Sequence, residues 1–125
     1  RAEVRTYTDV SKIMQPIIGD LPHEEFWVMF LNRSNRVIDK VLISSGGVSG
    51  TTVDVRIIMK KAIEKLASSL ILVHNHPSGN LTPSAEDKNL TKRIADAAKF
   101  FGINVVDHVI IADKSVYSFA ESGLL

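Results

Sequence analysis

Residues 71–87 read ILVHNHPSGNLTPSAED and join an apolar run, two histidines, a turn-forming segment and an acidic segment. The apolar run is typical of a buried strand, and the residues after Pro83 are typical of the start of a helix. Side chains two positions apart on a strand point to the same face, so His74 and His76 direct two imidazoles at one point.

The two histidines are candidate ligands of a metal ion. Turn-forming residues between positions 77 and 82 allow the chain to fold back, and Asp87 then adds a carboxylate oxygen from the following helix. Two nitrogens and one carboxylate leave a fourth position open, as in catalytic zinc sites. The chain has no cysteine, so a site closed by thiolates is excluded. Imidazole and carboxylate suit zinc, although other divalent first-row metals accept the same ligands.

A second interpretation of these residues needs no metal. Ser84 can cap the helix, and Asp87 in its first turn complements the helix dipole. A single histidine on a strand is more often a structural residue than a ligand. The pair of histidines at strand spacing, followed by a tight loop and a carboxylate, favours a metal site over capping alone.

The remaining pattern predicts an α/β domain with a mixed β-sheet and flanking helices. Apolar stripes of helical period predict helices over residues 9–18, 54–68 and 83–101. Apolar runs predict strands over residues 24–31, 37–43, 70–74, 103–112 and 116–119. The first two strands form a hairpin, and the first should be central because it is apolar on both faces. A glycine-rich, irregular connection is expected over residues 44–52.

The histidine motif resembles a known family. His74-x-His76-Pro77, followed after seven residues by Ser84-x-x-Asp87, is similar to the metal-binding signature of the JAB/MPN (JAMM) metalloprotease superfamily. The longer string HNHPSG, with Asp107-His108 downstream, resembles the RadC branch, historically called bacterial DNA repair proteins. The resemblance runs over nearly the whole chain. It implies the JAB/MPN fold, whose architecture is similar to that of cytidine deaminases.

The resemblance also implies a domain organisation. Residues 1–125 would form a single RadC-like JAB/MPN domain. Relatives of this branch carry an additional N-terminal helical region. We therefore expect this chain to be the C-terminal domain of a longer protein.

A role for each site residue follows from the resemblance. It implies one Zn²⁺ per chain, held by His74, His76 and Asp87, with a water in the fourth position that attacks an amide or isopeptide bond. Glu24 would be the general base, and Ser84 would hydrogen-bond the water or the developing oxyanion. Glu25 is the alternative register for the base. A slip of one residue sends the carboxylate to the opposite face, so only one of the two can serve.

Asp107 and His108 interrupt the predicted strand 103–112. Either could orient a metal-binding imidazole, because such histidines usually donate their other N–H to a carboxylate or carbonyl. A structural hydrogen bond within the sheet explains the two residues equally well. The sequence leaves both interpretations open.

Composition limits the alternatives. Fifteen basic and 14 acidic residues give a formal net charge of +1, so any DNA contact would need a local patch. A protein- or DNA-binding module associated with DNA repair, without catalysis, is the alternative function. A zinc nucleobase deaminase would show a Cys-x-x-Cys pair, which is absent. No apolar run approaches membrane-span length and no signal peptide is evident, so we expect a cytoplasmic protein.

Overall fold

The structure is a computed structural model that describes residues 1–46 and 53–125. Along these residues the helices and strands follow in the order α1 (Tyr7–Ile18), β1 (Glu25–Leu31), β2 (Val37–Ser45), α2 (Val55–Glu64), β3 (Ser69–Asn75), α3 (Ala85–Lys99), β4 (Asn104–Ala112) and β5 (Ser115–Ser118). The predicted α/β class with a mixed sheet and flanking helices is confirmed, and the arrangement is consistent with a JAB/MPN-type fold. Within the described residues, every helix is too short or too polar to cross a membrane.

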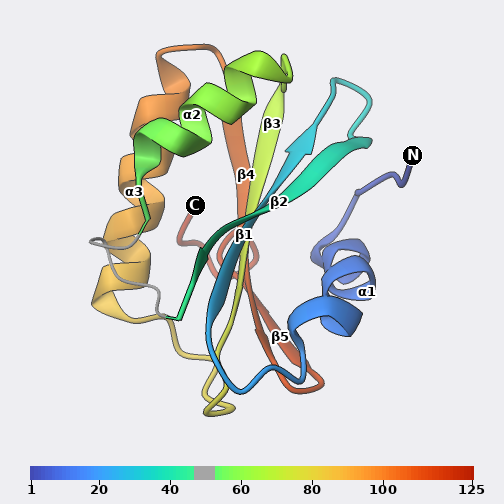
Figure 1. Ribbon diagram of the computed structural model, residues 1–125, viewed down its shortest axis with the longest axis vertical. Coiled ribbons are helices and arrows are strands. Elements are labelled where there is room, and N and C mark those ends of the chain that lie inside the picture. The colour runs from blue at the N-terminus through green and yellow to red at the C-terminus, as the bar shows by residue number, and fades with distance from the viewer. Residues whose placement is uncertain (47–52) are drawn as a thin grey trace.

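The five strands form one sheet in the order β2-β1-β3-β4-β5. Only the β3–β4 pair is parallel, and the other three pairs are antiparallel. Helices α2 and α3 cover one face of the sheet, and α1 covers the other (Figure 1). Because both faces are covered, interior strands are apolar on both sides, as the sequence predicted for β1.

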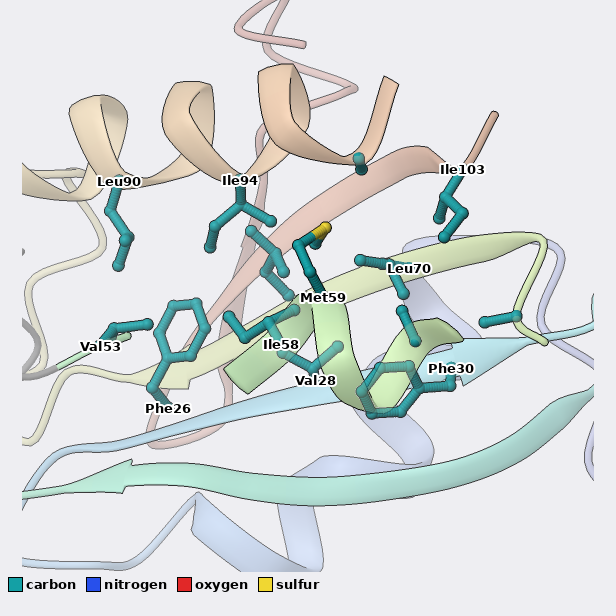
Figure 2. Packing of buried hydrophobic residues seen from close by; sticks show 14 residues of the cluster. Phe26, Val28, Phe30, Val53, Ile58, Met59, Leu70, Leu90, Ile94 and Ile103 are labelled. Carbon is teal, nitrogen blue, oxygen red and sulfur yellow. The ribbon is translucent and has the colours of Figure 1, made fainter. Parts of the chain in front are cut away.

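Side chains of β1 alternate between two cores. Phe26, Val28 and Phe30 belong to the cluster under α2 and α3, whereas Met29 and Leu31 belong to the cluster under α1. Figure 2 shows the first cluster, in which side chains of α3 descend toward β1 and β3. This alternation fixes the register of β1, and with it the face to which each residue at its acidic start belongs.

Helix α3 buries polar as well as apolar side chains. Leu90, Ile94 and Ala98 lie in the core, and Asp87 and Thr91 are buried on the same side of the helix. The spacing of these residues follows the helical period, so one face of α3 carries all five. The apolar part of this face therefore fixes the rotation at which the two polar residues meet the sheet.

Strand β4 agrees with the strand predicted over residues 103–112. It runs from Asn104 to Ala112 and includes the polar residues Asp107 and His108. Val105 pairs with Leu70 of β3 and Asp107 pairs with Ile71, so one extra residue lies between them in β4. Such a β-bulge reverses the alternation of the residues that follow. Accordingly Val105 packs in the α2–α3 core, while Val109 packs in the α1 core.

Several element boundaries also differ from the prediction. Helix α1 begins at Tyr7 after the cap residue Thr6, and Asp9 lies within its first turn, where its carboxylate accepts a hydrogen bond from the Thr6 N–H. Helix α2 ends at Glu64, shortly before Leu66 adopts a positive φ of 52°. Ser44 and Ser45 extend β2, and most of the expected irregular connection, residues 47–52, lies outside the described residues.

We expect Leu90→Ala to lower the free energy of unfolding by about 2–5 kcal/mol, because it leaves a cavity between α3 and the sheet. Leu90 is 1% exposed. Phe100→Ala is the control: this ring is 90% exposed, and its removal should change stability by less than about 0.5 kcal/mol. Urea unfolding followed by circular dichroism measures both values. Equal losses in the two variants would contradict the packing described for α3.

Candidate metal centre

Three potential metal ligands converge at the end of β3. The Nε2 atoms of His74 and His76 lie 2.9 Å apart. Asp87, from the first turn of α3, places Oδ1 3.4 Å from the His74 Nε2 and Oδ2 3.4 Å from the His76 Nε2. All three ligand atoms lie within 4.8 Å of one another. The structure thus brings together the three residues that the sequence indicated as ligands.

The separations of these atoms fit a small divalent ion. A tetrahedral zinc ion with bonds of about 2.0–2.1 Å separates its ligand atoms by about 3.3 Å. The two nitrogen–oxygen distances are close to this value, and the nitrogen–nitrogen distance is somewhat shorter. Imidazole nitrogen and carboxylate oxygen are also the ligand types that zinc and its first-row neighbours accept. The donor set therefore fits a divalent metal.

The loop after β3 determines which nitrogen of His76 carries hydrogen. His76 Nδ1 lies 2.6 Å from the backbone carbonyl oxygen of Asn80. A carbonyl oxygen only accepts, so Nδ1 must donate. In the neutral ring Nε2 then carries a lone pair directed at the ligand cluster, which is the form that binds a metal.

Burial and hydrogen bonds act in opposite directions on the Asp87 carboxyl, which is 2% exposed. Burial by itself raises the pKa of Asp87, but hydrogen bonds with His74, His76 and the Ser84 backbone hold the pKa well below its ordinary value. The hydrogen bond with Asp87 raises the pKa of His76, although burial opposes this effect. A buried negative charge facing two imidazoles makes this point of the molecule attractive to a cation.

The capping and metal-ligand interpretations of Ser84 and Asp87 are compatible. The Ser84 Oγ accepts a hydrogen bond from the Asp87 N–H at 3.0 Å, and Asp87 Oδ2 accepts one from the Ser84 N–H at 2.8 Å. This reciprocal pair is a capping box. The same bonds fix the orientation of the carboxylate, whose Oδ1 points to His74. Capping thus holds the carboxylate in place beside the imidazoles.

A polar pocket opens beside the three candidate ligands. Two of them line it together with both residues for which the resemblance implies catalytic roles, and its lining comprises Glu24, His76, Ser78, Asn80, Thr82, Ser84, Glu86 and Asp87. Glu25 is directed elsewhere: its carboxylate contacts His23 Nε2 and accepts from the Trp27 indole N–H, both at 3.0 Å. The pocket therefore contains Glu24, while Glu25 is engaged outside it.

Asn75 is a structural contributor that sequence reasoning missed. Its side chain is 2% exposed; Oδ1 accepts from the Glu25 N–H at 2.7 Å, and Nδ2 donates to the His23 carbonyl at 2.9 Å. These bonds hold the backbone on both sides of Glu24. An amide in an otherwise apolar strand was the available signal, because a buried amide needs hydrogen-bond partners.

Of Asp107 and His108 in β4, only His108 contacts a candidate ligand. Its Nε2 lies 2.6 Å from His74 Nδ1. Asp107 instead accepts hydrogen bonds from the Ser118 hydroxyl at 2.6 Å and from the Ala120 N–H at 3.0 Å. Burial lowers the pKa of His108, which favours the neutral ring. Thr91, which sequence reasoning also missed, contacts His108 from α3.

Comparison with known proteins identifies the family of this chain. The family model of the RadC-like JAB domain matches residues 4–124. A UPF0758 protein of Flavobacterium johnsoniae is 51% identical over 98% of this chain and 53% of its own length. A UPF0758 protein of Porphyromonas gingivalis is 50% identical over 91% of this chain and 51% of its own length. UPF0758 protein YfjY of Escherichia coli is 43% identical over 86% of this chain and 68% of its own length.

The matches extend over almost the entire sequence but not over whole relatives. The chain spans about half the length of the Flavobacterium and Porphyromonas proteins. The expectation that residues 1–125 form the C-terminal domain of a longer protein stays a prediction. The family match, together with the JAB/MPN-type sheet and the clustered His/His/Asp side chains, shows that this chain belongs to the RadC-like JAB domain family.

Proposed function

We propose that this chain is a metal-dependent hydrolase of amide or isopeptide bonds, with one Zn²⁺ per chain held by His74, His76 and Asp87. The observation that carries the proposal is the convergence of three ligand atoms within 4.8 Å of one another at the wall of a polar pocket. The pocket also contains Glu24 and Ser84, which can act as a base and a hydrogen-bond donor. Two of the three ligands, the base and the donor therefore line one pocket, which is the proposed binding site of the peptide bond.

When bound, zinc lowers the pKa of a coordinated water from 15.7 to about 7 and polarises a carbonyl oxygen. Glu24 takes a proton from the attacking water and delivers it to the leaving amine. The hydrogen bonds from Asn75 to the residues before and after Glu24 support this role, because they hold its backbone at the pocket. Glu24 also acts electrostatically on the neighbouring imidazole, where it raises the pKa of His76.

Ser84 is proposed to stabilise the oxygen on which negative charge develops. Its Oγ accepts from the Asp87 N–H, and a hydroxyl keeps one hydrogen of its own to donate. The capping box holds this hydroxyl at the pocket, so little reorganisation is needed during the reaction. One such donor typically contributes about 2.7–4 kcal/mol of transition-state stabilisation.

We expect Asp87→Asn to lose stoichiometric zinc, because it removes the negative charge while the amide oxygen can still accept the Ser84 N–H. Glu86→Gln is the matched control: it removes one charge from the same turn and the same pocket, and zinc should stay bound. Metal analysis of gel-filtered protein after zinc addition gives the ratio per chain. Wild-type protein that holds no zinc but binds DNA with a steep salt dependence would favour the binding-module alternative.

Turnover should fall by about 10²- to 10⁴-fold in Glu24→Gln, while zinc remains bound, because only the base is lost. Glu25→Gln is the control and should retain turnover, since its carboxylate contacts His23 and Trp27. A library of fluorogenic peptides and isopeptide-linked lysine peptides provides the assay. If Glu24→Gln loses zinc, Glu24 is a metal ligand and not only a base. If turnover is lost only in Glu25→Gln, the general base is Glu25 and not Glu24.

Ser84→Gly separates capping from catalysis. Glycine at this cap position costs only a few tenths of a kcal/mol, whereas removal of one oxyanion donor lowers kcat by about 10²- to 10³-fold. We expect kcat to fall with KM and the melting temperature nearly unchanged. A variant with normal kcat would leave Ser84 with the capping role alone.

A further inference from the structure

A continuous chain of hydrogen bonds runs behind the candidate ligands. The Thr91 hydroxyl donates to the Asp87 carbonyl oxygen at 2.7 Å. Thr91 Oγ1 lies 2.6 Å from His108 Nδ1, and His108 Nε2 lies 2.6 Å from His74 Nδ1. Thr91 is 2% exposed, and both imidazoles have no exposed surface. We call these four linked groups, the Asp87 carbonyl, Thr91, His108 and His74, the relay.

The carbonyl at the start of the relay gives it a direction. Two oxygens 2.7 Å apart require a hydrogen between them, and a carbonyl has none to give, so the Thr91 hydrogen points to Asp87. The Thr91 oxygen must then accept from His108 Nδ1. In the neutral ring that burial favours, His108 Nε2 accepts the hydrogen of His74 Nδ1. In the neutral ring of His74, Nε2 then carries a lone pair that can bind a metal.

The surroundings of His108 hold its ring in this orientation. Phe119 stacks on the imidazole with ring centroids 4.5 Å apart and planes 19° apart, and Phe26 meets it edge-on at 5.7 Å. Both ring nitrogens are engaged, one by Thr91 and the other by His74. The ring is therefore enclosed by apolar groups except where the relay enters and leaves it.

We infer that Thr91 and His108 are positioning residues that set the tautomer of His74, so that its Nε2 lone pair faces the metal. This inference rests on the proposed metal site and deepens it. His76 obtains the same tautomer from a nearby carbonyl, that of Asn80. His74 instead depends on His108, which is 34 positions away in the chain. His108 in turn depends on Thr91, which is 17 positions from it. Because the relay starts at Asp87, it also couples a ligand on α3 to a ligand on β3.

The test compares Thr91→Val with Thr91→Ser. Valine keeps the shape of threonine but cannot accept from His108 Nδ1, so His108 should move its hydrogen to Nε2 and donate to His74. His74 would then carry hydrogen on Nε2, facing the metal. We expect zinc affinity to fall by about 10- to 100-fold in Thr91→Val and to be retained in Thr91→Ser. Ser118→Ala is the control, since it removes a buried hydroxyl that bonds Asp107 outside the relay.

Two measurements decide the outcome on the same folded chain. Competition with a chromophoric chelator gives the affinity for Zn²⁺, and ¹⁵N–¹H correlation spectra of the four histidines in metal-free protein report which ring nitrogen carries hydrogen. In wild-type protein we expect hydrogen on His74 Nδ1 and none on His108 Nε2, and in Thr91→Val hydrogen on His108 Nε2 and none on His74 Nδ1. Thermal unfolding checks that the variants fold.

Each result supports or overturns the relay separately from hydrolysis. Unchanged zinc affinity in Thr91→Val, or wild-type His74 without hydrogen on Nδ1, overturns the relay. Wild-type protein that binds zinc as expected but cleaves no substrate would contradict the proposed hydrolase activity and leave the relay supported. Protein that binds no zinc at all would overturn both.

Discussion

The burial of one carboxylate between two imidazoles is the interaction on which the rest of the site depends. Asp87 is almost fully buried, and removing a charge from water is unfavourable unless partners compensate it. Its partners come from two directions, the imidazoles at the end of β3 and the backbone N–H of Ser84 at the helix cap. The apolar face of α3 holds the helix against the sheet at the rotation that allows these contacts. Packing, capping and the candidate metal centre are therefore parts of one arrangement.

The sheet brings the functional residues together at one end of its central strands. β1 is antiparallel to β3, so its acidic start lies beside the end of β3, where Phe26 pairs with His74. β4 runs parallel to β3 on the other side and contributes His108. The order β1-β3-β4 thus places His74 at the end of β3 between an acidic strand start on one side and the His108 imidazole on the other. Substitutions at this end of the central strands should lower metal affinity more than similar substitutions at the opposite end.

The network around the site explains why so many polar groups tolerate burial here. Within the described residues, every buried side-chain nitrogen or oxygen has a hydrogen-bond partner. Asn75 bonds backbone groups on both sides of Glu24, and Asp107 binds the turn after β5 and stays clear of the ligands. A satisfied polar network of this kind restricts each side chain to one orientation. That restriction is what a metal ligand and a general base require.

The sequence by itself determined the features that follow from local periodicity. Alternation along β3 put His74 and His76 on one face, and helical spacing put Ser84 and Asp87 in one cap. The class of fold and most elements followed from the same patterns. Only the tertiary structure decided which residue of Asp107-His108 meets His74. The bulge before Asp107 reverses the alternation of β4, and a bulge depends on pairing with β3, which lies more than 30 residues away and leaves no local pattern. The partners of Asn75 and Thr91 were hidden for the same reason, because each depends on segments that only the folded sheet brings together.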